Sequence, residues 1–195
     1  MIIKENDKRG LKVIKSRLIK GGVFIFPTFT IYGFSACLFD VYANKKILSL
    51  KKRSVNNPFI VIADLDFIVD ASDFSDKDFL VSILKANATV IVKTKIKFPF
   101  YASKDNKTAF RLANTDVLRY LTDRFPITST SVNISGKQAI NDVKKIVNIY
   151  KNRVFGIVCG RVENIQSTIV DIANKEPLIL RKGYNIDIIE HLCNK

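Results

Sequence analysis

Short apolar runs, each bounded by turn residues, are the feature that most constrains the fold of this chain. Four of them are VFIF (23–26), PFIVIAD (58–64), ATVIVKT (88–94) and FGIVCG (155–160). Runs of this length and composition are typical of buried strands, and all are far too short for a membrane span. Further strands are predicted over 31–38, 108–112, 127–132, 167–173 and 178–183.

Amphipathic segments between these runs predict helices. The expected helices cover 8–20, 41–52, 75–86, 116–125 and 141–152, and a last short helix begins after Asn185. Gly21-Gly22 ends the first helix, while Asp40 and Thr115 are expected to cap the second and the fourth. Helices and strands do not alternate strictly, which favours a sheet with antiparallel as well as parallel pairs. We expect one α/β domain over residues 1–195, with a large, twisted, mixed sheet flanked by helices.

The net charge is strongly positive, at +14 over 195 residues, from 32 Lys and Arg against 18 Asp and Glu. Such a field attracts polyanions: RNA, nucleotide phosphates or acidic partners. Much of the excess is scattered lysine in a sequence rich in Lys, Asn and Ile, a pattern that a biased genome also produces. Charge alone therefore leaves nucleic-acid contact open.

The scarcity of histidine and cysteine excludes several kinds of site. His191 is the only histidine, and the three cysteines are odd in number and far apart. A histidine-based triad, a zinc site and a disulfide framework are therefore not expected. The start, MIIKENDKRG, lacks the apolar stretch of a secretion signal, so we expect a cytoplasmic protein with no membrane attachment.

Lysine and arginine would have to hold any nucleotide phosphates, because no glycine-rich phosphate loop of either common type is present. Polar segments stand instead at strand or helix ends: PTFTIYG (27–33), LKKRSVNNP (50–58), TSTSVNISG (128–136), and the pair STIVD (167–171) with ILRKG (179–183). Each has an ordinary explanation by itself. A Lys-x-Arg at a helix end complements the helix dipole, a strand end rich in Ser and Thr is usually a turn, and Ser-Thr before a strand often only fills the sheet.

The order and spacing of these segments carry more information than any one of them. The pattern is Pro-Thr-x-Thr-x-Tyr-Gly, Lys-x-Arg-x4-Pro, Thr-Ser-x-Asn-x-Ser-Gly, Ser-Thr-x-Val-Asp and Ile-Leu-Arg-x-Gly, within about 21–183. It resembles the YrdC/Sua-type family, the threonylcarbamoyl-AMP synthases that begin the t6A modification of tRNA. The resemblance implies a YrdC-like fold of the short form, without a C-terminal extension domain.

The activity that the resemblance implies is that of an L-threonylcarbamoyladenylate synthase, a nucleotidyltransferase. It would condense L-threonine, bicarbonate and ATP, with Mg²⁺, to threonylcarbamoyl-AMP and pyrophosphate, and its partners would be tRNA and downstream t6A-transfer proteins. Lys51 and Arg53 would be the catalytic cations, and no protein metal site is expected. Threonine would be bound by Thr30, Arg111 and Ser167. ATP would be bound by Lys51, Arg53, Ser129, Ser131, Asn133 and Arg181.

These residues are expected to share one cavity, and Thr30, Lys51, Arg53, Ser131, Asn133 and Arg181 are expected to line it. Arg111 is expected to bind the threonine carboxylate through two N–H groups of its guanidinium. It stands mid-strand between Phe110 and Leu112, where an unpaired charge would be costly. The alternative is that Arg111 lies on the exposed face of its strand.

The chain departs from the family pattern at several positions. Phe29 stands where an acidic residue is usual, Ser54 replaces a proline after the arginine, and Asn57 replaces a lysine before Pro58. A usual Pro-Gly-x-x-Thr is ANAT (86–89) here. The second motif has therefore lost one of its usual cations, which bears on substrate affinity.

Two other functions stay open. The first is a non-catalytic RNA-binding YrdC-like module in translation or ribosome maturation, which would grip RNA by phosphate contacts. The second is a carbamoyl-transfer domain of the kind found in hydrogenase maturation, which usually belongs to a much longer chain with zinc fingers. Conversion of ATP to AMP and pyrophosphate that depends on threonine and bicarbonate would separate the synthase from the RNA-binding module.

Overall fold

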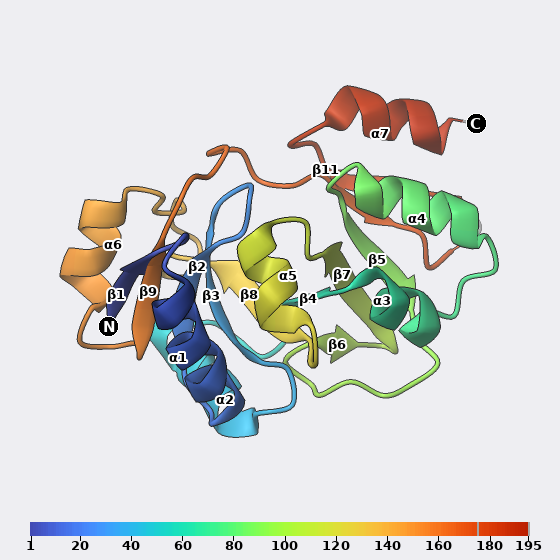
Figure 1. Cartoon of the computed structure of the whole chain (residues 1–195). Coiled ribbons are helices and arrows are strands. Elements are labelled where there is room, and N and C mark those ends of the chain that lie inside the picture. The colour runs from blue at the N-terminus through green and yellow to red at the C-terminus, as the bar shows by residue number, and fades with distance from the viewer. Residues whose placement is uncertain (175, 195) are drawn as a thin grey trace.

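All the strands belong to one mixed sheet that runs the length of the molecule (Figure 1). The structure is a computed structural model that describes residues 1–174 and 176–194. The strands lie in the order β1 (Ile2–Lys4), β9 (Gly156–Cys159), β2 (Phe24–Pro27), β3 (Tyr32–Cys37), β8 (Ile127–Ser131), β4 (Ile60–Ala63), β7 (Lys107–Leu112), β5 (Thr89–Lys93), β10 (Ile169–Asp171) and β11 (Leu178–Arg181), with β6 (Ser103–Lys104) paired to β7. The pairs β1–β9, β2–β9, β4–β7 and β5–β10 are parallel and the others are antiparallel. The predicted mixed sheet is confirmed.

Helices flank this sheet, and most begin after an Asp or Thr whose side chain caps the helix. They are α1 (Lys8–Ile19), α2 (Val41–Lys51), α3 (Leu65–Ala71), α4 (Lys77–Lys85), α5 (Asp116–Thr122), α6 (Val143–Tyr150) and α7 (Ile186–Cys193). Asp40 accepts a hydrogen bond from the backbone N–H of Ala43 and Thr115 from that of Leu118, so both predicted caps are confirmed. The sequence did not predict β1, α3 or β6. Among the described residues, no helix is both long enough and apolar enough to cross a membrane.

Alternation along the central strands separates a core face from an open face. In β7, Phe110 belongs to the larger of two apolar clusters, whereas Arg111 points to the opposite side. The same alternation places Val61 of β4 in that cluster and Ile62 on the other face. Ile62 also belongs to the second cluster, under α1 and α5, so the open face lies beside those helices.

Candidate active site

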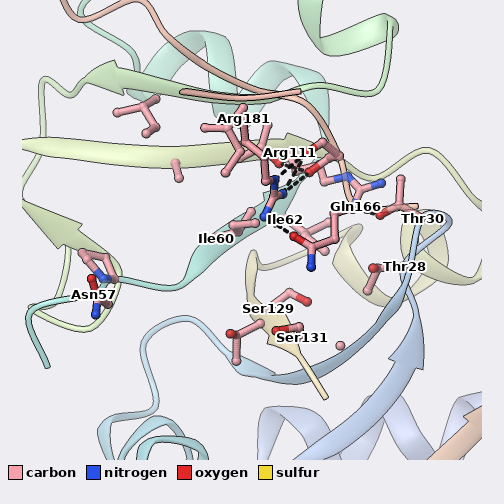
Figure 2. Close-up of a pocket in the computed structure, with 18 of the residues that line it drawn as sticks. Thr28, Thr30, Asn57, Ile60, Ile62, Arg111, Ser129, Ser131, Gln166 and Arg181 are labelled. Carbon is pink, nitrogen blue, oxygen red and sulfur yellow. Dashed lines mark hydrogen bonds between the residues drawn. The ribbon is translucent and has the colours of Figure 1, made fainter. Parts of the chain in front are cut away.

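A cavity of about 520 Å³ opens on this second face of the sheet (Figure 2). Alternate side chains of β4, β7, β5 and β10 point into it. The rest of its wall comes mainly from the β2–β3 turn, the α2–β4 loop, β8, the segment before β10 and Arg181 of β11. The floor is apolar, made by Ile60, Ile62, Ile91, Ala109 and Ile169. A concave site with an apolar floor and a few converging polar groups is typical of small-molecule binding.

The charged side chains of the wall are mostly cationic. The cations are Arg53, Lys104, Lys107, Arg111 and Arg181, and the carboxylates are Asp105 and Asp171. One cation is already paired, because Lys107 Nζ lies 3.2 Å from Asp171 Oδ2. Arg53, Arg111 and Arg181 have no carboxylate partner among the described residues, so the cavity suits an anionic ligand.

Arg111 is the most deeply buried of these cations, with 4% of its surface exposed. Its Nη1 donates a hydrogen bond of 2.7 Å to Thr30 Oγ1, and its buried Nη2 has no partner within the described structure. Burial, followed by the nearby charge of Arg181, lowers the pKa of Arg111 to about 10. The guanidinium stays charged at neutral pH, and one of its donors is left for a ligand.

The PTFTIYG segment forms a tight turn that presents Thr30 to Arg111. Thr28 Oγ1 donates to the Ile31 carbonyl over 2.6 Å, and Phe29 adopts a left-handed backbone conformation with φ of 69°. Such a conformation is costly for a bulky residue, and here the Phe29 ring packs edge-on against Tyr184 at 5.2 Å. Gly33 then lets β3 approach β8, since a Cβ there would lie 2.3 Å from Ser129 Oγ.

Arg181 reaches the cavity from β11 and is fixed by the segment that precedes β10. Its Nε and Nη2 donate to the Ser167 carbonyl over 3.0 and 2.8 Å, and its Nη1 donates to Gln166 Oε1 over 2.5 Å. Nη2 also lies 3.2 Å from Ser167 Oγ, which in turn lies 2.7 Å from Thr89 Oγ1. Figure 2 shows Thr30, Arg111, Gln166 and Arg181 gathered together, with Asn57 apart from them.

Arg53 lines the wall from the loop after α2. Its Nε and Nη2 donate to the carbonyls of Asn57 and Pro58 over 2.8 and 3.2 Å, and its Nη1 lies 3.4 Å from Thr130 Oγ1. Its guanidinium also lies over the ring of Phe59. Burial lowers the pKa of Arg53, although an arginine remains protonated at neutral pH. These contacts shape the 53–58 loop around a cation that borders the cavity.

Lys51 and Asn133 do not line the cavity but lie behind its wall. Lys51 is 1% exposed, and its Nζ donates to the Ser131 carbonyl over 2.5 Å and to Asn133 Oδ1 over 2.5 Å. Ser131 Oγ donates to the same Asn133 oxygen over 2.7 Å, and Ser131 lines the cavity. Of the six residues expected to line one cavity, the structure thus brings Thr30, Arg53, Ser131 and Arg181 together in its wall and the other two just outside it.

Comparison with known sequences identifies the family. The profile of the Sua5/YciO/YrdC family, described as "Telomere recombination", matches residues 16–183. The chain belongs to the Sua5/YciO/YrdC family. It is 29% identical over 184 residues to a candidate threonylcarbamoyl-AMP synthase of Methanocaldococcus jannaschii, covering 92% of this chain and 88% of that protein. It is 29% identical over 171 residues to the threonylcarbamoyl-AMP synthase of Bacillus subtilis, covering 83% of this chain but only 49% of that longer protein.

Solved structures of the Sua5/YciO/YrdC family share the fold. Sua5 of Pyrococcus abyssi in complex with L-threonine superposes with a TM-score of 0.82 at 22% identity, over 94% of this chain and 57% of that one. YciO of Escherichia coli superposes with a TM-score of 0.80 at 21% identity, over 94% and 93% of the two chains. This chain therefore spans little more than half of the Pyrococcus protein and nearly all of the Escherichia one.

Some residues that line the cavity are not predicted as site residues from the sequence. Thr89, Gln166, Lys107 and Asp171 line the cavity of this Sua5/YciO/YrdC domain, and so do the floor residues. The alternation of Thr89 and Ile91 with buried Val90 and Val92 was a usable signal, because it places the first pair on the open face once the sheet order is known.

The Lys51 ammonium gives the stability of the domain a pH dependence. Burial, and to a smaller extent the charge of Arg53, lowers the pKa of Lys51 from 10.5 to about 7. Between these values the unfolded chain binds the proton and the native chain does not, so the free energy of unfolding rises with pH. The difference in unfolding free energy between wild type and Lys51→Met should therefore rise from about pH 7 towards pH 10.

Urea unfolding at several pH values measures this difference. Lys46→Met, which removes an exposed lysine of the same helix, should leave the pH dependence unchanged. If the difference in unfolding free energy between wild type and Lys51→Met does not change over this pH range, the pKa of Lys51 is not lowered. Nitrogen-15 NMR titration of Nζ gives the same answer if that variant does not fold.

Proposed function

We propose that this chain is an L-threonylcarbamoyladenylate synthase, a nucleotidyltransferase that uses L-threonine, bicarbonate and ATP in the t6A modification of tRNA. The observation that carries the proposal is the buried guanidinium of Arg111, which faces a cationic cavity with one donor free. The relatives are named threonylcarbamoyl-AMP synthases, which supports this activity. The cations of the cavity suit a carboxylate and a triphosphate. An RNA-binding module without catalysis is not favoured, because such a cavity is not needed to grip an RNA backbone.

The chemistry requires positioning and fixed positive charge more than a covalent nucleophile. The threonine amine joins bicarbonate with loss of water, which gives a carbamate. A carbamate oxygen then bonds to the α-phosphorus of ATP, the bond to the β-phosphate breaks, and pyrophosphate leaves. Negative charge moves on to the phosphates as this happens, and fixed cations aimed at it lower the barrier.

Arg111 and Thr30 are the proposed anchors of threonine. Nη2 of Arg111, which has no partner within the described structure, would donate to the carboxylate, while the bond from Nη1 to Thr30 holds the guanidinium in place. Ser167 is placed beside them by its contact with Arg181. A site that hydrogen-bonds the threonine hydroxyl would discriminate against 2-aminobutyrate and valine, which lack it.

ATP is proposed to lie along the remainder of the wall. Arg53 and Arg181 are the proposed phosphate cations, and Ser129 and Ser131 offer hydroxyls from β8. Lys51 and Asn133 would act through Ser131, because both contact that residue from behind the wall. The apolar floor offers a surface for the base or the substrate carbon atoms.

A magnesium ion that accompanies ATP fits this donor set only loosely. The described residues contain no cluster of three or more acidic, histidine or cysteine side chains, and Asp171 is engaged by Lys107. Asp105 is the remaining carboxylate of the cavity. Mg²⁺ would therefore be held mainly by the phosphates and water, as is common for this ion. Transfer of the product to tRNA by further t6A proteins, in the cytoplasm, belongs to the same proposal.

Mass spectrometry tests the proposed activity directly. The protein is incubated with ATP, labelled bicarbonate and each amino acid in turn. We expect a labelled threonylcarbamoyl-AMP and pyrophosphate that appear only when threonine and bicarbonate are both present. Absence of this product with folded protein, or equal product from 2-aminobutyrate, would contradict the assignment of activity or of substrate respectively.

Arg53→Ala should lower synthase turnover by at least about tenfold and by up to about a hundredfold, because removing a charge-assisted contact to developing charge costs up to roughly 3 kcal/mol. Lys52→Asn is a matched control, since it removes the adjacent exposed charge and asparagine tolerates the left-handed backbone of Lys52, whose φ is 50°. Turnover measured by pyrophosphate release should stay normal in the control. Near-normal turnover in Arg53→Ala would leave Arg53 the role of shaping the 53–58 loop.

Arg111→Ala should weaken threonine binding by about tenfold or more while ATP binding is largely kept, because a hydrogen bond to a charged group contributes about 1.5–3 kcal/mol. Calorimetric titration of each ligand into each variant measures this. Arg111→Met keeps more of the buried volume if the alanine variant is unstable, and Arg119→Ala, an exposed arginine paired with Asp116, is the control. Equal threonine affinity in wild type and both Arg111 variants would remove Arg111 from the threonine site.

A further inference from the structure

Ser167 belongs to a short chain of hydrogen bonds that runs from the core into the cavity. Its Oγ lies 2.7 Å from Thr89 Oγ1 and 3.2 Å from Arg181 Nη2. Thr89 is the first residue of β5, is fully buried, and has its backbone N–H on the Thr168 carbonyl at 2.8 Å. Its position is therefore fixed by the sheet, and its hydroxyl has Ser167 as its one hydrogen-bonding partner among the described residues.

The direction of the Thr89–Ser167 bond decides what Ser167 can do. A hydroxyl donates one hydrogen and accepts two. If Ser167 donates to Thr89, no hydrogen remains for a ligand. If Thr89 donates, then Ser167 accepts from both Thr89 and Arg181, and its own hydrogen is free to point into the cavity.

An anion in the cavity selects the second arrangement. It gains a hydrogen bond from Ser167, and a bond to a charged acceptor is stronger than one between neutral groups. One cation of the cavity already lacks an acceptor, because Nη2 of Arg111 has no partner within the described structure. With its lone pairs occupied, Ser167 would meet an acceptor oxygen of the substrate and not its ammonium group.

We infer that Thr89 is a positioning residue that aims the Ser167 hydroxyl hydrogen at an anionic oxygen of the amino-acid substrate. The inference rests on the proposed function for the identity of that substrate. Thr89 also borders the cavity, but in this arrangement its hydroxyl hydrogen is used on the Ser167 oxygen, so it acts on the substrate through Ser167. In the substrate complex the hydrogen bonds run in one direction, from Thr89 to Ser167 and from Ser167 to the substrate.

The test compares L-threonine affinity in wild type, Thr89→Val and Thr89→Ser by calorimetry, in the absence of ATP. Valine keeps the shape of the side chain and removes the hydroxyl, while serine keeps the hydroxyl. We expect threonine to bind about fivefold to tenfold more weakly to Thr89→Val, a loss equal to one hydrogen bond, and nearly normally to Thr89→Ser. The Michaelis constant for ATP should not change in either variant.

Thr108→Val is the matched control for loss of a buried threonine hydroxyl. Thr108 is 1% exposed in β7, and its Oγ1 has no hydrogen-bond partner within the described structure. It faces away from the cavity, between the lining residues Lys107 and Ala109. Thr108→Val should leave threonine affinity and the thermal midpoint close to those of the wild type.

A double-mutant cycle separates positioning from a merely structural role. In a Ser167→Ala background, Thr89→Val should weaken threonine binding no further, because the residue through which it acts is gone. Additive losses in the cycle, or wild-type threonine affinity in Thr89→Val, would overturn the inference. If wild type binds threonine but forms no adenylate, the proposed function fails and the inference is still decided by the titrations. If wild type binds no threonine, both fail.

Discussion

A buried guanidinium without a carboxylate partner is the interaction on which the rest of the site depends. Arg111 sits in mid-sheet, 4% exposed, with Thr30 as its one hydrogen-bond partner among the described residues. Taking such a charge out of water is costly unless the protein surrounds it with partners. Here the sheet, the Thr30 turn and the Arg181 segment hold it in place without neutralising it, so the partner is left to come from outside.

The order of the sheet brings the sequence-distant parts of the site together. β4, β7, β5 and β10 are neighbours, although they span residues 60–171 of the chain. Because side chains alternate, each of these strands gives one set to the core and the other to the cavity. The same alternation therefore produces the hydrophobic stability of the fold and the lining of the site.

Local signals allowed most of the elements to be predicted from the sequence. Asp40 and Thr115 are capping residues, and runs such as ATVIVKT are apolar and short, so helices and strands there were recognisable. β1 has only two apolar residues before charges begin, α3 has seven residues directly after a strand, and β6 has two residues, so each lacks a periodic signal. The order of the polar segments along the chain indicated the family, but it does not show how deeply each side chain is buried. Lys51 and Asn133 look like lining residues in sequence, and only tertiary packing places them behind Ser131.

Charge repulsion acts between two neighbouring arginines of the cavity, Arg111 and Arg181. Arg181 is close enough to lower the pKa of Arg111, so the two guanidinium groups disfavour each other while no anion lies between them. An anionic ligand relieves this repulsion, pairs the free donor of Arg111 and binds the native state alone, which stabilises the fold by mass action. The electrostatic cost that the free protein bears is thus recovered on binding. Arg181, which is fixed by Gln166 and Ser167, couples that gain to the segment before β10. A bound anionic substrate is therefore expected to order the segment before β10, which forms part of the cavity wall.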